Sequence, residues 1–367
     1  NYGFKIGSTG FFNITGEYLD RGRTNRSTTW TGKIFNDSDS PITQFRDGKE
    51  WTFLPDDQEL ARRGLTRDDF SMKTGQGKAQ MGAVFYNTKV PLGENAEFYS
   101  FGGLTYRNGF ATGFYRLPYQ EERVNLNVYP NGFLPEIHTK IRDYSAAFGV
   151  KGLHKGWIVD GSLALGGNSF TFNIENSINA SIGESSPVSF DAGTLRFRQF
   201  TGNVDVLRNI DTGGAVKSLS VAFGAEVRVE NYQIEAGQFE SYSLGNGGDR
   251  PGIDFDTTSS GGPKNPGSQV FPGFQPANEV DRYRNSIGLY AEVESDVTDQ
   301  LLLSAAGRFE NYSDFGSTVN GKFAARLEVL PELAFRGAVS TGFRAPSLHQ
   351  IWFNNVSIQF VIDPNTG

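Results

Sequence analysis

The sequence predicts an all-β protein, and more specifically a transmembrane antiparallel β-barrel. The first observation is composition, because the 367 residues include 45 glycines and 13% aromatic residues, which favours strands and turns over helices. The second is strict alternation of apolar and polar residues over stretches of about 9–11 residues, the length of a tilted membrane strand. The third is that tight turns alternate with long polar connections, as in membrane barrels.

The alternation defines about a dozen strands. It is clearest where Val221, Phe223 and Val227 share one face and Glu226 and Arg228 share the other. The expected strands cover residues 2–6, 11–19, 79–90, 97–107, 142–153, 157–168, 195–207, 218–232, 284–295, 300–312, 319–330 and 333–342.

The connections between these strands differ in length. Tight turns are expected near residues 7–10, 91–94, 154–156, 296–299 and 331–332, and long polar loops near 20–77, 109–140, 169–194 and 234–282. This asymmetry is typical of short periplasmic turns and long extracellular loops. A short outer turn near residues 313–318 departs from it.

A soluble β-sandwich would also alternate, with its apolar face turned inward. It would bury Val221, Phe223, Ile287 and Leu289 in a core. The barrel is favoured because the apolar faces carry small residues such as Ala305, which lipid tolerates, whereas a sandwich core needs bulk. The sandwich binding module remains an alternative.

Several functional classes are disfavoured by composition. The chain has no Cys and a net charge of −7, so thiolate chemistry and a basic face for nucleic acid are not expected. The three histidines are far apart, and Asp249, Asp254 and Asp256 lack EF-hand spacing, so no metal site is predicted. No GxSxG, HExxH or Walker motif occurs, so we expect neither an enzyme nor a cofactor.

Two motifs carry a resemblance to a known family. Arg308–Thr318 reads R-x-E-x-Y-S-D-F-G-S-T, and Ser340–Leu348 reads S-T-G-F-R-A-P-S-L. Together they closely resemble the mid-barrel signature of TonB-dependent outer-membrane receptors. Weaker matches near residues 10–26, 130–137 and 156–179 extend the resemblance over essentially the whole chain, and it is densest over 219–351.

The resemblance implies that residues 1–367 are part of a single barrel domain of about 22 strands. The family's N-terminal plug and TonB box have no counterpart here. The family ends in a strand with a terminal aromatic, whereas this chain ends Asp363-Pro364-Asn365-Thr366-Gly367. We therefore expect the plug domain and the C-terminal strands to lie outside this chain, since an open arc would leave unpaired strand edges in lipid.

The function that the resemblance implies is TonB-energised uptake of a scarce nutrient of the ferric siderophore, cobalamin or oligosaccharide class. The implied location is the outer membrane of a Gram-negative bacterium, among phospholipid and lipopolysaccharide. The implied partners are that ligand and the TonB-ExbB-ExbD system, which acts through the plug. A passive porin or adhesive barrel without TonB coupling is the alternative. The barrel motifs do not specify the ligand.

Candidate site residues follow from this reading. Ligand contacts should come from long loops held by a rigid scaffold, and the loop residues expected to make them are Tyr115, Arg116, Tyr119 and Arg123. The alternative is that these residues belong to an ordered loop without a binding role, or to the aromatic girdle of the barrel. The signature residues are expected to be structural, with Arg344 pairing with wall carboxylates and Pro346 ending a strand; they are Arg308, Glu310, Tyr312, Asp314, Gly342, Phe343, Arg344, Ala345, Pro346 and Ser347.

Overall fold

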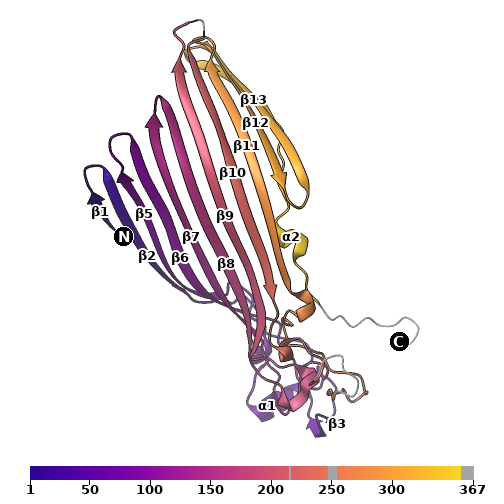
Figure 1. Cartoon of the computed structure of the whole chain (residues 1–367). Coiled ribbons are helices and arrows are strands. Elements are labelled where there is room, and N and C mark those ends of the chain that lie inside the picture. The colour runs from indigo at the N-terminus through magenta and orange to yellow at the C-terminus, as the bar shows by residue number, and fades with distance from the viewer. Residues whose placement is uncertain (215, 247–253, 357–367) are drawn as a thin grey trace.

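A computed structural model describes residues 1–214, 216–246 and 254–356 (Figure 1). Asp249 and the chain end at Asp363–Gly367 lie outside the described residues. Within the described part, twelve antiparallel strands form one sheet, in which each strand pairs with the next one in the order given. They are β1 (Tyr2–Ile6), β2 (Gly10–Arg21), β5 (Lys78–Pro91), β6 (Ala96–Thr112), β7 (Glu136–His154), β8 (Trp157–Glu175), β9 (Phe190–Asp211), β10 (Ser218–Glu235), β11 (Val280–Asp296), β12 (Leu301–Tyr312), β13 (Gly316–Leu330) and β14 (Leu333–Ser340).

The predicted strands are confirmed, but several were predicted too short at the end near the long loops. The strand expected at 157–168 extends to Glu175, and the one expected at 142–153 begins at Glu136. Alternation marks only the part of a strand with lipid on one face. Beyond it the same strand continues between loops that cover it, so the pattern ends before the strand does.

The sequence also missed structure inside the first long loop. Residues 22–77 contain a hairpin of β3 (Ile42–Arg46) and β4 (Lys49–Phe53), the helix α1 (Asp56–Arg63) and the 3-10 turn η1 (Arg67–Phe70). α1 has acidic residues in its first turn and Arg62 and Arg63 in its last, as the helix dipole favours. Gly64 ends it in the left-handed conformation (φ 67°).

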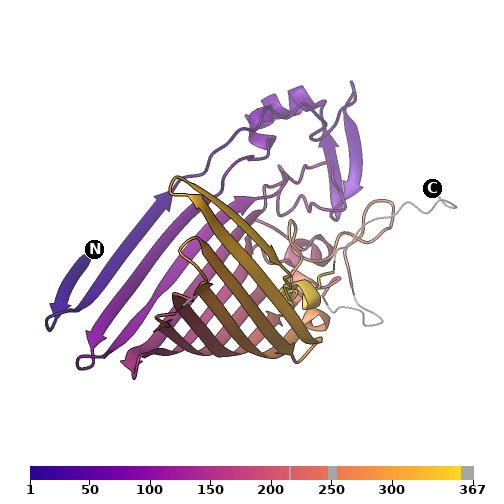
Figure 2. The same cartoon turned by 90° about the horizontal axis from the view of Figure 1, so that it is seen from above.

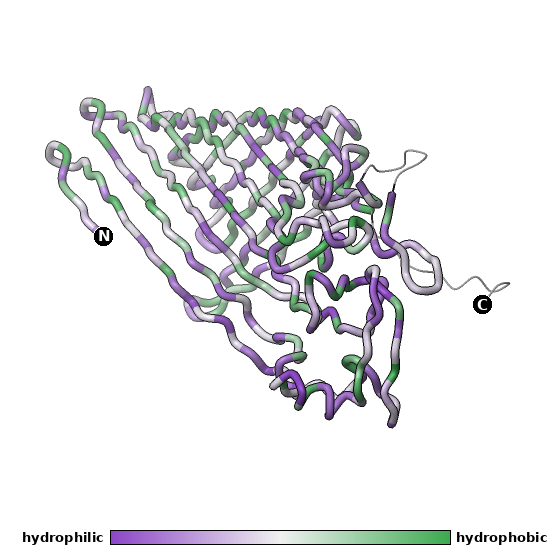
Figure 3. The backbone as a smooth tube through the Cα atoms, turned by 90° about the horizontal axis from the view of Figure 1, so that it is seen from below, coloured by the Kyte–Doolittle hydropathy of each residue, from purple (hydrophilic) through white to green (hydrophobic). Residues whose placement is uncertain are grey.

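The two faces of the sheet differ in chemistry, and the difference excludes the sandwich. Phe223, Ile287 and Leu289 are 47%, 44% and 48% exposed, and Val221 is only partly buried. These side chains form an apolar outer face rather than a core, and hydrophobic and hydrophilic residues alternate along the strands in Figure 3. On the opposite face, some polar side chains form hydrogen bonds with residues two strands away.

Those contacts identify the concave face. The Tyr99 hydroxyl on β6 donates to Asp160 on β8 (2.8 Å), and the Tyr290 hydroxyl on β11 donates to Asp205 on β9 (2.6 Å). Such reach is expected where side chains converge inside a curved wall, and Figure 2 shows the curvature. We call this polar concave side the lumen face.

The sheet is an open arc. Within the described ranges, β1 pairs only with β2, and β14 pairs only with β13 (Figure 2). The two end strands lie on opposite sides of the arc, consistent with part of a larger barrel.

The hydrophobic core lies in the loops rather than in the wall. Loops from residues 22–77, 113–135 and 176–189 meet at one end of the sheet, beside α1 and β3 in Figure 1. They bury one apolar cluster, which comprises Ile34, Phe35, Phe53, Leu60, Phe70, Leu117, Val124, Leu126, Phe133, Ile178 and Ala180. We call this assembly the loop cap. Among the described residues, no helix is long and apolar enough to cross a membrane.

Candidate functional site

The loop cap contains a pocket with an aromatic lining. Its volume is about 300 Å³, near the lower end of small-molecule sites. All four residues that the sequence suggested as ligand contacts line it, together with residues of the first loop. The lining residues are Trp30, Phe70, Met72, Phe114, Tyr115, Arg116, Leu117, Tyr119, Gln120 and Arg123. We call it the aromatic pocket.

Tyr115 and Arg116 form the fixed side of this pocket. The Tyr115 hydroxyl donates to the Asn131 carbonyl (3.1 Å), and its ring packs on Phe70 at 5.1 Å between centroids. Burial, and secondarily Asp69, raises the pKa of Tyr115 to about 12, so the phenol stays neutral. Arg116 is 9% exposed and donates from Nε to Gln269 (3.1 Å). Burial and then Arg123 lower the pKa of Arg116 to about 10, so it is charged at neutral pH.

Tyr119 and Arg123 form the accessible side. Tyr119 is 41% exposed, and its backbone N–H donates to the Ile34 carbonyl (3.0 Å), which fixes the loop without using the ring. The Arg123 side chain is 38% exposed, and its Nε lies 3.3 Å from a carboxylate oxygen of Glu122.

Buried carboxylates fold the first loop against this pocket. Asp56 accepts hydrogen bonds from the backbone N–H groups of Ile34, Phe35 and Asn36, at 2.7 to 2.9 Å. Burial raises the pKa of Glu59, but hydrogen bonds from Arg62 and Arg63 outweigh it and hold that pKa below its usual value. The loop that carries Trp30 and Phe70 is thus an ordered part of the cap.

A buried charge network joins three loops. Arg46 donates to the carbonyls of Pro118 (2.8 Å) and Val124 (3.0 Å) in the second loop. Lys264, in the loop between β10 and β11, is 0% exposed and pairs with both Asp47 and Asp256. Asp47 also accepts from the Leu126 N–H (2.8 Å). We call this network the loop clasp.

The fourth loop joins the clasp through amides. Asn179, from the β8–β9 loop, donates to the carbonyls of Glu240 (2.9 Å) and Ser243 (2.8 Å) in the β10–β11 loop. Beside these loops lies a polar hollow of about 440 Å³ that Asp47, Asn125, Asp254 and Asp256 help to line. Within the described ranges, no group of three or more His, Asp or Glu side chains could hold a metal ion.

Two of the signature residues, Asp314 and Pro346, meet around Arg284 on β11. Arg284 is 2% exposed, donates from Nε to Asp314 (2.8 Å) and from Nη2 to the Pro346 carbonyl (2.9 Å), and lies 3.5 Å from Glu230. It therefore joins the turn after β12 to the segment after β14. Arg308 lies on the lumen face, 3.0 Å from Glu310 and 3.5 Å from Glu226.

The second motif folds the chain back over the lumen face. The rings of Phe343 and Phe315 lie 5.5 Å apart, and those of Phe343 and Tyr312 lie 6.3 Å apart. Ser347 then caps α2 (Leu348–Trp352), and Leu348 is buried against Tyr232 on β10. Gly342 precedes Phe343, and Ala345 lies between Phe343 and α2. An added Cβ at Gly342 would meet nothing within 4 Å.

One expectation within this motif is wrong. Arg344 was expected to pair with wall carboxylates, but it is exposed and makes no ion pair with the described residues. Arg284 occupies that role because it lies on β11 and faces inward between Glu230 and Asp314. Arg284 lies outside both motifs, and in the sequence it stands only within a weaker family match at Arg284-Asn285-Ser286, which indicated no partner for it.

Residues that the sequence reading missed include Trp30 and Phe70 of the pocket and Lys264 of the clasp. A lysine in a Gly-rich loop reads as solvated, and only the folded loops show that it is buried. Trp30 and Phe70 lie in the segment 20–77, which was predicted only as a long polar loop.

The comparisons with known proteins give a family. Residues 84–367 match the family model described as TonB dependent receptor-like, beta-barrel. No curated protein matches the sequence. Among solved structures, a double mutant of the ferric enterobactin receptor PfeA from Pseudomonas aeruginosa matches with a TM-score of 0.53 and 11% identity, over 95% of this chain and 41% of that one.

A second PfeA structure, a mutant in complex with enterobactin, matches with a TM-score of 0.52 and 10% identity, over 94% of this chain and 41% of that one. At these identities the likeness concerns the fold. The chain spans about 41% of the length of these receptors.

Proposed function

The chain belongs to the TonB-dependent receptor β-barrel family, and from that premise we propose that it supplies wall and ligand-binding outer loops to a receptor that imports a scarce nutrient with energy delivered through TonB. Barrels of this family lie in the outer membrane of Gram-negative bacteria, so the apolar face of the sheet contacts lipid. The loop cap then faces the outside, because long loops are extracellular.

The observation that carries the proposal is the aromatic pocket in the loop cap. Its rings offer stacking surfaces, and Arg116 and Arg123 supply positive charge beside them. That combination suits an anionic, oxygen-rich aromatic group. A ferric siderophore with such groups is the ligand class that we propose. About 300 Å³ holds one arm of such a molecule rather than the whole.

We also propose that the sheet is completed by strands beyond this arc and that the lumen holds a plug through which TonB acts. Among the described residues, β1 and β14 each pair on one edge only, and this supports the proposal because a strand edge in lipid leaves backbone groups without partners. A passive porin is the second candidate, and it predicts uptake that survives dissipation of the proton gradient.

The pocket is tested with Tyr119→Ala and Arg123→Gln in the full-length receptor. Removing a stacked ring costs about 1 kcal/mol, so we expect the dissociation constant for a ferric catecholate siderophore to rise roughly fivefold to tenfold. Trp30 lines the pocket, and quenching of its fluorescence reports binding.

Phe45→Ala is the matched control, because Phe45 is 64% exposed on β3 and does not line the pocket. Equal affinity in all three variants and the unmodified receptor would remove the pocket from ligand recognition. Growth under iron limitation checks the same ranking in cells.

A further inference from the structure

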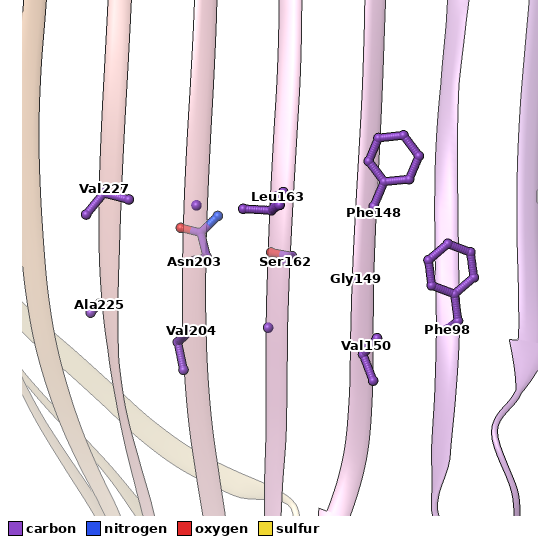
Figure 4. A pocket seen from close by; sticks show the side chains of 12 residues that line it. Phe98, Phe148, Gly149, Val150, Ser162, Leu163, Asn203, Val204, Ala225 and Val227 are labelled. Carbon is purple, nitrogen blue, oxygen red and sulfur yellow. The ribbon is translucent and has the colours of Figure 1, made fainter.

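The lipid-facing wall is not uniformly convex. A hollow of about 550 Å³ crosses strands β6 to β10 on the outer face (Figure 4). Its walls are the large apolar side chains of Phe98, Phe148, Val150, Leu163, Val204 and Val227. The smallest residues of its lining are Gly149, Gly161, Gly202 and Ala225. We call it the wall hollow.

The backbone register explains the hollow. Gly161 lies opposite Val150 on one side and Val204 on the other, while Gly202 lies between Leu163 and Val227. Small residues on adjacent strands therefore sit among bulky ones. An added Cβ at Gly161 would meet nothing within 4 Å, whereas one at Gly202 would touch Val227 (3.2 Å) and Leu163 (3.4 Å).

A cationic group lies on the same face nearer the short turns. Arg208 shares the outer face of β9 with Val204, four residues or about 13 Å away along the strand. Its guanidinium lies 5.3 Å from the Trp157 ring and beside Gly156. It makes no hydrogen bond or ion pair with the residues that the structure describes.

We propose that Arg208 and the wall hollow together bind one phospholipid of the periplasmic leaflet. Arg208 supplies donors for the phosphate, and Trp157 sits at the level of the headgroups, as aromatic residues do at membrane interfaces. One acyl chain lies in the hollow. The lining is mostly apolar, so the chain covers few polar groups of the protein.

The depth of the hollow selects the leaflet. Gly161 is four residues from the start of β8 at Trp157, which is the short-turn end, whereas β8 continues to Glu175 at the loop end. Short turns are periplasmic, so the hollow faces the half of the membrane built from phospholipid. Lipopolysaccharide occupies the other half.

The test is native mass spectrometry of the full-length receptor released from bilayers that contain phosphatidylglycerol and lipopolysaccharide. The unmodified receptor is expected to retain one phosphatidylglycerol. Gly161→Leu fills the hollow and Arg208→Gln removes the charge, and each is expected to lower the retained fraction at least fivefold. Arg208→Lys should restore part of it.

Matched controls separate this site from general loss of folding. Gly307→Leu makes the same change on the lipid face of β12, outside the hollow, and an added Cβ at Gly307 would meet nothing within 4 Å. Lys217→Gln removes another cation at the same end of the wall, one that pairs with Asp299. Both should retain the lipid.

Three outcomes would overturn the proposal. They are unchanged retention in Gly161→Leu, equal losses in Gly161→Leu and Gly307→Leu, or a retained lipopolysaccharide in place of phosphatidylglycerol. If Gly161→Leu loses its heat-resistant gel mobility, Gly161→Ala replaces it, and the expected loss becomes smaller but keeps its direction.

Discussion

Arg284 illustrates how a single residue organises the late strands. A guanidinium presents five donors in a fixed plane, and Arg284 uses them on Asp314, Glu230 and the Pro346 carbonyl, while its face covers Phe315 at 5.4 Å. Each partner belongs to a different segment. The residue therefore fixes the chain path after β14 more directly than the motif residues themselves.

Replacing Arg284 with Met is expected to destabilise the barrel by about 3 kcal/mol, because two partly buried carboxylates would lose their cation. Urea unfolding of the full-length receptor in micelles measures it. Arg326→Met is the control, since Arg326 and Glu328 are 41% and 32% exposed. An exposed pair contributes at most about 1 kcal/mol. Equal decreases in the free energy of unfolding for the two variants would show that Arg284 contributes no more than an exposed ion pair.

The sequence predicted the location of some aromatic and charged residues correctly and that of others incorrectly. Tyr115, Arg116, Tyr119 and Arg123 were suggested as neighbours in sequence, and the structure brings all four to one pocket. Arg344 was expected to pair with wall carboxylates because it lies in a motif, but its contacts depend on the direction in which the chain turns after β14 ends. That turn is set by contacts from β10 and β11, which lie far away in sequence.

At the scale of elements, the strands were predictable and the loop cap was not. Lipid imposes a period of two on every strand, so composition along 218–232 reveals β10 directly. The cap has no such repeat. The β3–β4 hairpin is held by Arg46, which donates to the carbonyls of Pro118 and Val124 in the second loop. The start of α1 is held by Asp56, which accepts from backbone N–H groups 20 to 22 residues earlier in the same loop. No local pattern shows either set of partners.

α1 gives a prediction about acid. The pKa of Glu59 is held below 4.5 in the folded protein, so its contribution to stability is present above about pH 4.5 and is lost as the pH falls through the folded value. We expect amide hydrogen exchange across α1, measured by mass spectrometry and corrected for intrinsic rates, to accelerate below that pH.

Glu59→Gln imitates the protonated state. Its α1 amides should exchange faster at pH 7 and should respond less to acid than those of the unmodified protein. Asp37→Asn is the control, because Asp37 is exposed and its one ion pair with a described residue is to Lys33. A variant Glu59→Gln that kept the full acid response would place the sensitive group elsewhere.

At the scale of the whole molecule, the open arc predicts that β1 and β14 are not neighbours in the intact receptor. Twelve strands are more than half of a barrel of about 22, so β1 and β14 should be separated by other strands in the intact receptor. These 367 residues contain no Cys, so they add no background to a crosslink between engineered cysteine pairs.

A cysteine at Phe4 on β1, combined in turn with each lipid-facing position of β14, is expected to form no disulfide in the full-length receptor under mild oxidation. Ala305→Cys with Phe323→Cys is the positive control, because these residues are direct partners on β12 and β13, whose Cβ atoms lie about 5 Å apart. An efficient Phe4 crosslink to β14 would mean that the twelve strands close on themselves.

The loop clasp has a consequence for immune recognition and for engineering. Lys264 and Arg46 join loops that are far apart in sequence, and both are buried. The outer surface is therefore a composite of several segments held in one arrangement. A synthetic peptide that copies one loop would not reproduce the surface that an antibody meets on the cell. A loop graft from a relative would likewise need its clasp partners transferred with it.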